Sequence, residues 1–113
     1  MKTRRFALTT VVFAAAVGLS LSAVAANTTQ TIKQVELRVS TSTPDLLLQT
    51  NDGVNYQGTA TYSQGCGIVA PTADAVKIWA SLGQAALLSG KNVTIYYTNC
   101  GGTNWIQDVV LVR

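Results

Sequence analysis

The clearest hydrophobic pattern in the chain is a strict alternation of apolar and polar residues in its first half. Val35, Leu37 and Val39 fall on one side of an extended segment, and Glu36 and Arg38 fall on the other. A period of two residues is typical of a strand with one buried and one exposed face. We therefore predict a half-buried strand at this point.

Shorter apolar runs predict four more strands, which turn-forming residues separate. These strands are expected at 46–50, 54–63, 92–98 and 105–112. Asn51-Asp52-Gly53 is expected to form a tight hairpin turn, because these residue types tolerate a positive φ. Gly58 is expected to mark a bulge or a sharp bend in its strand, and the polar stretch 27–31 is expected to be a loose arm.

A period of three to four residues predicts one helix between the third and fourth strands. It should begin near Thr72, where Thr72 or Asp74 can cap free N–H groups, and end at Gly90 in a left-handed C-cap. Its apolar and small positions are Val76, Ile78, Trp79, Ala80, Leu82, Gly83, Ala85, Ala86 and Leu87. Because they form a wide stripe, we expect a largely buried helix with Trp79 in the core.

The order of three strands, one helix and two strands predicts an α+β domain. Five short strands with one helix between strands 3 and 4 are typical of a small OB-like Greek-key barrel, the oligonucleotide/oligosaccharide-binding type. An open α+β roll has the same order of elements, so both architectures remain open at this point.

The N-terminus has the parts of an export signal. Lys2, Arg4 and Arg5 form a positive region, residues 6–17 are apolar, and small residues follow. This pattern predicts a signal peptide at 1–26.

Removal of that segment leaves a single OB-like domain at 27–113, which we expect to be secreted or periplasmic. An uncleaved anchor is the alternative, because residues 6–26 are long enough to span a bilayer. The small residues at the end of the segment favour cleavage, and no stable membrane insertion is expected afterwards.

The net charge of +3 comes from the basic residues of the predicted signal peptide. Three of the eight basic residues lie there, and the remaining five balance the five acidic residues, since 5 − 5 = 0. A neutral domain lacks the basic surface that a phosphate backbone requires. We therefore expect no nucleic-acid partner.

The chain has two cysteines, Cys66 and Cys100. In a small exported domain two cysteines usually form a structural disulfide. Two buried thiols or a redox pair are the alternatives, although a redox pair normally has a much closer spacing.

The chain contains no histidine. Ser-His-Asp and Cys-His catalytic groups are therefore excluded, as is a tetrahedral zinc site of the usual kind. The few carboxylates are scattered over different predicted elements. We expect no enzyme activity, no cofactor and no metal.

Trp105 and Asn104 are the candidate ligand-binding residues. They follow a glycine pair at the start of the last predicted strand. Aromatic faces stack on the C–H surfaces of sugars, and amides bind sugar hydroxyls. Ordinary packing in a small barrel places aromatic residues in a similar way, so both interpretations stay open.

The segment 82–97 reads LGQAALLSGKNVTIYY. Its Gln-Ala pair, its glycine cap and its Val-x-Ile-Tyr-Tyr strand resemble the helix-to-strand segment of the B subunits of subtilase-cytotoxin-like and typhoid-toxin-like bacterial toxins. The chain also resembles small exported bacterial proteins of unknown function. The toxin resemblance implies an OB-fold, a disulfide, a ring-shaped homopentamer and binding of host glycans.

Three hypotheses follow for the function. The first is a non-catalytic recognition module that binds carbohydrate, like a toxin B subunit, and forms a homo-oligomer. The second is a periplasmic or secreted structural or protein-interaction protein without a small ligand. The third is a small hydrolase that uses a carboxylate.

Overall fold

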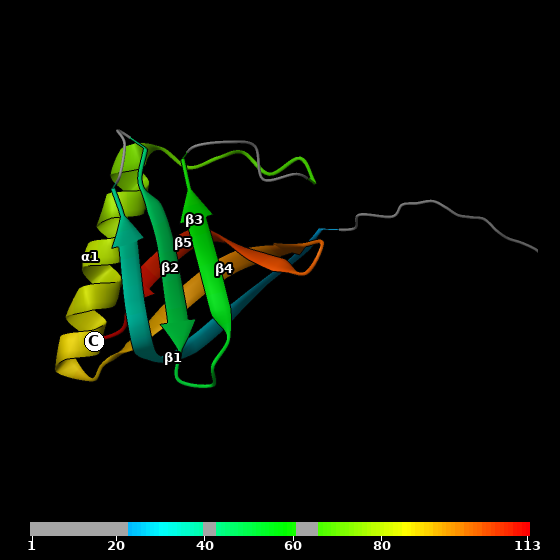
Figure 1. The fold of residues 1–113 in the computed structure, drawn as a ribbon. Coiled ribbons are helices and arrows are strands. Elements are labelled where there is room, and N and C mark those ends of the chain that lie inside the picture. The colour runs from blue at the N-terminus through cyan, green and yellow to red at the C-terminus, as the bar shows by residue number, and fades with distance from the viewer. Residues whose placement is uncertain (1–22, 40–42, 61–65) are drawn as a thin grey trace, which may run out of the picture.

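A computed structural model describes residues 23–39, 43–60 and 66–113 (Figure 1). They form an α+β domain in which one helix lies between the third and fourth of five strands, as the sequence predicts. The elements are β1 (Val24–Arg38), β2 (Asp45–Thr50), β3 (Asn55–Thr59), α1 (Ala73–Ser89), β4 (Asn92–Cys100) and β5 (Thr103–Leu111). Within these described ranges, no helix is long and apolar enough to cross a membrane.

The stretch 27–31 is part of β1, so the prediction of a loose arm was wrong. It pairs in antiparallel with β4, and the ladder runs from Val24↔Asn99 to Thr31↔Asn92. Threonine is a residue type that is enriched in strands. The pattern missed this strand because its partner lies far along the chain and its own side chains are mostly polar.

β1 therefore begins at Val24, within the segment predicted to be a signal peptide. Residues 1–22 lie outside the described part of the chain. The cleavage site stays a prediction.

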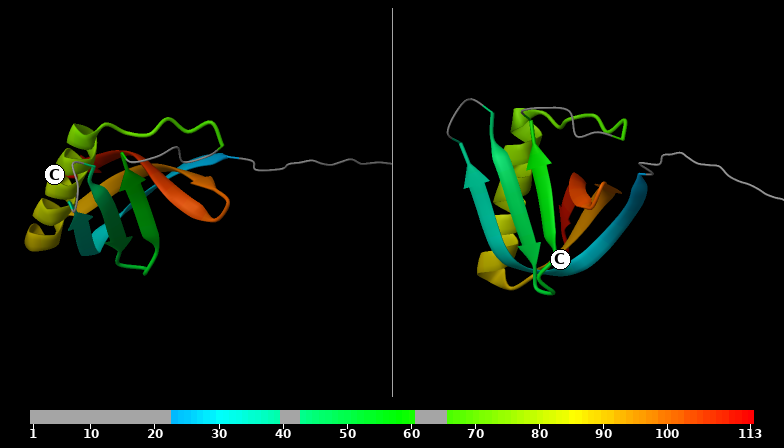
Figure 2. Two further views of the ribbon diagram at one scale, coloured as in Figure 1. Left: turned by 45° about the horizontal axis from the view of Figure 1, so that its top comes forward. Right: turned by 45° about the vertical axis from the view of Figure 1, so that its right-hand side comes forward.

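β1 bends at a bulge, where it exchanges one partner strand for another. Its register with β2 shifts between Ile32 and Gln34, so Lys33 is the extra residue. β1 pairs with β4 up to Thr31 and with β2 from Ile32 onwards. A bulge bends its strand and increases the twist, and Figure 2 shows β1 curving between the two parts of the sheet.

A second bulge lies in β5. Tyr96 pairs with Asp108 and Tyr97 pairs with Ile106, which leaves Gln107 as the extra residue. The curved sheet closes where β3 and β5 meet in parallel, with 57 paired to 105. The strand order is β1-β2-β3-β5-β4, and β4 pairs again with β1.

The helix ends are capped as predicted. The Thr72 hydroxyl accepts a hydrogen bond of 3.1 Å from the Ala75 N–H. Gly90 has φ 71° and donates its N–H to the Ala86 carbonyl at 2.9 Å. Asp74 lies in the first turn, where the helix dipole favours a negative charge.

One side of α1 packs on the sheet and the other remains exposed. The buried positions are Val76, Trp79, Ala80, Gly83 and Ala86. They join apolar residues of all five strands in one core, which confirms the core position of Trp79. The helix is not largely buried, since Ile78 is 57% exposed and Leu88 is 77% exposed. Because the small sheet covers only one side of α1, the opposite side of the helix has no packing partner among the described residues.

Two glycines allow the helix to approach the sheet closely. The register of β3 with β2 is regular at Gly58, so the predicted bulge there was wrong. A Cβ at Gly58 would instead lie 3.2 Å from two ring atoms of Trp79. A Cβ at Gly83 would lie 2.7 Å from Leu48 Cδ2 and 3.3 Å from Val35 Cγ2.

We predict that Gly83→Ala lowers the free energy of unfolding by about 1–2 kcal/mol. Overpacking against the fully buried Leu48 costs about 1–3 kcal/mol, and the better helix propensity of alanine recovers up to about 1 kcal/mol. Urea denaturation measures the difference. The control is Gln84→Ala on the exposed side of the same turn, which should change stability by no more than about 0.5 kcal/mol. A Gly83→Ala variant as stable as the wild type would contradict this packing.

Candidate functional site

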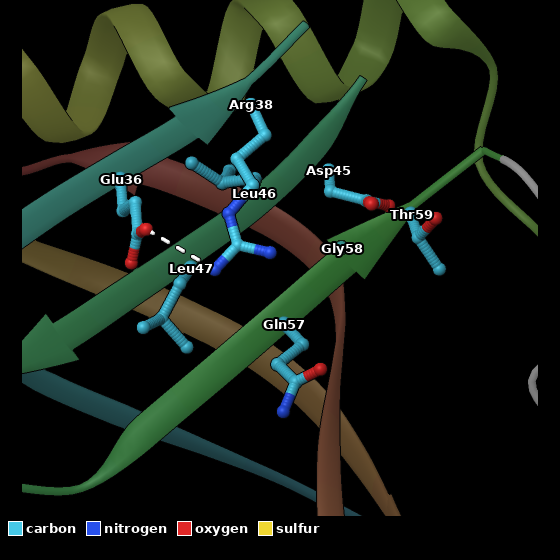
Figure 3. A pocket seen from close by; sticks show the side chains of 8 residues that line it. All are labelled: Glu36, Arg38, Asp45, Leu46, Leu47, Gln57, Gly58 and Thr59. Carbon is cyan, nitrogen blue, oxygen red and sulfur yellow. Dashed lines mark hydrogen bonds and ion pairs between the residues drawn. The ribbon is translucent and has the colours of Figure 1, made fainter. Parts of the chain in front are cut away.

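An open pocket lies on the face of β1, β2 and β3 that points away from the core (Figure 3). Directly paired residues share a face of a sheet, so two rows of side chains cross these strands. The first row is Glu36, Leu47 and Gln57, and the second is Arg38, Asp45 and Thr59. We call this space of about 310 Å³ the outer pocket.

The outer pocket is rich in hydrogen-bonding groups. Arg38 Nη2 lies 3.4 Å from Glu36 Oε2, and these side chains are 72% and 41% exposed. An ion pair this exposed contributes little to stability, so the guanidinium can turn towards a ligand at little cost. Gln57 adds an amide that both donates and accepts, and Leu47 adds an apolar surface. With Asp45, the pocket carries two negative charges and one positive charge.

Trp105 lies next to the outer pocket. The parallel pair Gln57↔Trp105 extends the first row of the pocket from β3 onto β5. Trp105 is only 8% exposed and does not belong to the central core cluster. Atoms outside that cluster therefore shield the indole ring from solvent, and we call them its cover.

The Cys66–Cys100 disulfide is a candidate for this cover. The bridge is present, with Cα atoms 6.1 Å apart, which confirms the predicted pairing. Cys100 pairs with Thr103, two residues before Trp105, so Cys100 and Trp105 share one face of the β4–β5 hairpin. The bridge thus ties the connection between β3 and α1 to the face that carries the indole.

Asn104 lies on the opposite face from Trp105, because neighbouring residues of a strand point in opposite directions. Asn99 donates its Nδ2–H to Asn104 Oδ1 at 2.8 Å. Asn104 in turn donates its Nδ2–H to the Asn55 carbonyl at 3.2 Å. Its amide therefore links the hairpin to the start of β3. The ligand contacts expected of Asn104 and Trp105 stay a prediction, and the two residues do not share a surface.

The turn between β2 and β3 has the predicted tight form, with Gly53 at φ 87°. The Asp52 carboxylate accepts hydrogen bonds from the Thr50 hydroxyl and, at 2.8 Å, from the Gln30 amide. The Val54 N–H donates a third bond at 3.2 Å. These bonds, that from Thr50 above all, lower the pKa of Asp52 because they stabilise its ionised form. The turn is thereby tied to β1.

A wider hollow of about 730 Å³ lies on the other side of β1, against α1. We call it the helix groove. Val35 and Leu37 line it from β1, and Ala85 and Leu88 line it from α1. The helix groove is mostly apolar, whereas the outer pocket is polar.

The described residues contain no group of three or more His, Cys, Asp or Glu side chains that could hold a metal ion. The outer pocket does bring two carboxylates, Glu36 and Asp45, to one place. The hydrolase hypothesis would depend on this pair.

Sequence reasoning did not identify the residues of the outer pocket. The alternation in β1 and the turn chemistry at 41–45 together indicate a β1–β2 hairpin. Its register places Arg38 opposite Asp45 and Glu36 opposite Leu47. That register could have been derived from the two strands, but the third strand of the pocket could not.

Comparison with known proteins identifies no relative. No protein-family model matches the sequence, and no curated protein matches it.

We predict that Asp52→Asn weakens the acid sensitivity of the fold. The folded pKa of Asp52 lies below its ordinary value of 3.8, so its contribution is present above about pH 4 and is lost as the pH falls through the folded value. Urea denaturation between pH 2 and pH 6 should show a smaller loss of stability on acidification for the variant than for the wild type. Equal slopes would contradict the role of the Asp52 hydrogen bonds. Asp45→Asn, which changes an exposed carboxylate outside this turn, is the matched control.

We predict that the double change Cys66→Ser, Cys100→Ser costs about 2–5 kcal/mol of folding free energy, because the bridge closes a long loop. It should also expose Trp105. Tryptophan emission of native protein in a Trp79→Phe background reports on this indole alone, and should shift to longer wavelength when the bridge is absent. An unchanged emission maximum would show that the bridge does not control the cover.

Proposed function

We propose that the domain is an exported, non-catalytic recognition module that binds carbohydrate and forms a homo-oligomer. We further propose that its closed mixed sheet is an OB-like Greek-key barrel. The strand order β1-β2-β3-β5-β4 and the helix between β3 and β4 support this architecture. The disulfide supports an oxidising compartment, either secreted or periplasmic.

The outer pocket is the observation that carries the carbohydrate proposal. A sugar presents neighbouring hydroxyls that donate and accept, together with an apolar C–H face. The carboxylate of Asp45 accepts, the guanidinium of Arg38 donates, and the amide of Gln57 does both. Leu47 lies in the first row, between Glu36 and Gln57, and offers an apolar contact.

The charge of the pocket narrows the class of sugar. Two carboxylates against one guanidinium leave an excess negative charge, which disfavours sulfated or sialylated chains. We therefore propose neutral glycans as the ligands. Trp105 adjoins Gln57 in the same row, so a ligand that displaces the cover could stack on the indole.

A protein-interaction role without a small ligand is the second candidate. The helix groove favours it, since Leu88 is 77% exposed beside the apolar residues of β1. Exposed apolar surface of this kind often marks a site of protein association.

We expect the mature protein to bind neutral glycans on a glycan array. Asp45→Ala and Gln57→Ala should each weaken binding about tenfold, since each removes a hydrogen bond worth about 1–2 kcal/mol. Trp105→Ala should also weaken binding if the indole contacts the ligand. Titration calorimetry with the best glycan measures the change.

Lys91→Ala, an exposed residue beyond the end of α1, is the control and should bind like the wild type. Thermal unfolding of each variant separates lost binding from lost folding. A wild-type protein that binds no glycan, or variants that all retain full binding, would refute the carbohydrate proposal.

A further inference from the structure

β1 has an open edge after its bulge. Its pairing with β4 ends at Thr31↔Asn92, and from Gln34 to Arg38 it pairs only with β2. No strand of the described ranges pairs with the other edge of this segment. Figure 2 shows this end of β1 as the outer strand of its three-stranded layer, with α1 behind the layer. An open edge presents unpaired N–H and C=O groups to any extended segment that approaches.

The open edge adjoins the helix groove. Leu37 is 39% exposed and Val39 is 53% exposed, and Leu88 of α1 lies across the groove from Leu37. A strand added at this edge would gain backbone hydrogen bonds and would also bury apolar side chains.

The sequence of the edge is complementary to itself. If two copies of β1 pair in antiparallel about a two-fold axis at Leu37, each Leu37 faces the partner's Leu37. Val35 then faces the partner's Val39 on the groove side. On the outer side, Glu36 faces the partner's Arg38, and the reverse pair occurs once more by symmetry.

Neighbouring registers do not pair opposite charges and apolar side chains in this way. An axis at Glu36 would place two carboxylates opposite each other, which is destabilising. An axis at Val35 would place Leu37 opposite the partner's Lys33 and leave Arg38 without an acidic partner. The charges of β1 therefore select one register, and a two-fold contact closes at two copies.

We propose that β1 is the interface of a two-fold dimer, in which Val35–Val39 pairs in antiparallel with the same segment of a second copy, centred on Leu37. The proposal rests on the homo-oligomer part of the proposed function, which it specifies, and its test does not require carbohydrate binding. It also places the two outer pockets side by side, with the partner's Arg38 beside Glu36.

Charge reversal tests the register. Glu36→Arg and Arg38→Glu each place like charges opposite one another at two symmetric points. Each should raise the dimer Kd about tenfold or more in sedimentation equilibrium. The double variant Glu36→Arg, Arg38→Glu exchanges the two signs and should restore the wild-type Kd. Gln107→Glu, an exposed residue of β5, should leave it unchanged.

A crosslink tests the axis. Directly opposed residues in antiparallel strands have Cβ atoms close enough for a disulfide after a small adjustment. Leu37→Cys should therefore form a covalent dimer under mild oxidation, whereas Val110→Cys, an exposed strand residue far from the edge, should stay monomeric on a non-reducing gel. Circular dichroism confirms that each variant folds.

A wild-type protein that is monomeric at high micromolar concentration would overturn the proposal, and so would a pentamer. A dimer Kd that neither single charge reversal raises, or that the double variant does not restore, would also overturn it. Titration calorimetry with glycans on the same samples keeps the two proposals apart. A monomer that still binds sugar would refute only the dimer, and a dimer that binds none would refute only the carbohydrate proposal.

Discussion

The bulge at Lys33 is the constraint on which the rest of the architecture depends. It allows one strand to pair with β4 through its first half and with β2 through its second half. The bulge in β5 adds curvature on the other side of the sheet. Without the bend in β1, β2 and β3 would continue a flat layer, and β3 could not come round to meet β5 at Gln57↔Trp105. The closed sheet, and the core enclosed between it and α1, both follow from that bend.

The same bend divides the surface into two chemically different regions. After the bulge, β1 presents Glu36 and Arg38 to the outer pocket and Val35 and Leu37 to the helix groove. The alternation of one short segment thus supplies a polar surface suited to hydroxyl groups and an apolar surface suited to another chain. The proposed sugar site and the proposed dimer contact would then lie on one strand and share Glu36 and Arg38.

Local signals predicted the helix and the turn well, because Thr72, Gly90 and Gly53 act on their immediate neighbours. Pairing over long distances in sequence accounts for the failures. The strand at 27–31 is recognisable only beside β4, and the outer pocket only once the register of β1, β2 and β3 is known. The exposure of Ile78 was missed for a related reason, since apolar periodicity cannot show how much of a helix the small sheet can cover.

The pairing of β1 with β4 also has a consequence for the order of events during folding. Val24, at the start of the described chain, lies beside Asn99, close to its end. The ladder that closes the sheet therefore cannot form until nearly all of the polypeptide is present, and topologies dominated by such distant pairings assemble slowly. A nascent chain of this kind stays open while it emerges, which would suit the export that we propose, because an unfolded polypeptide can thread through a translocation channel before it becomes compact.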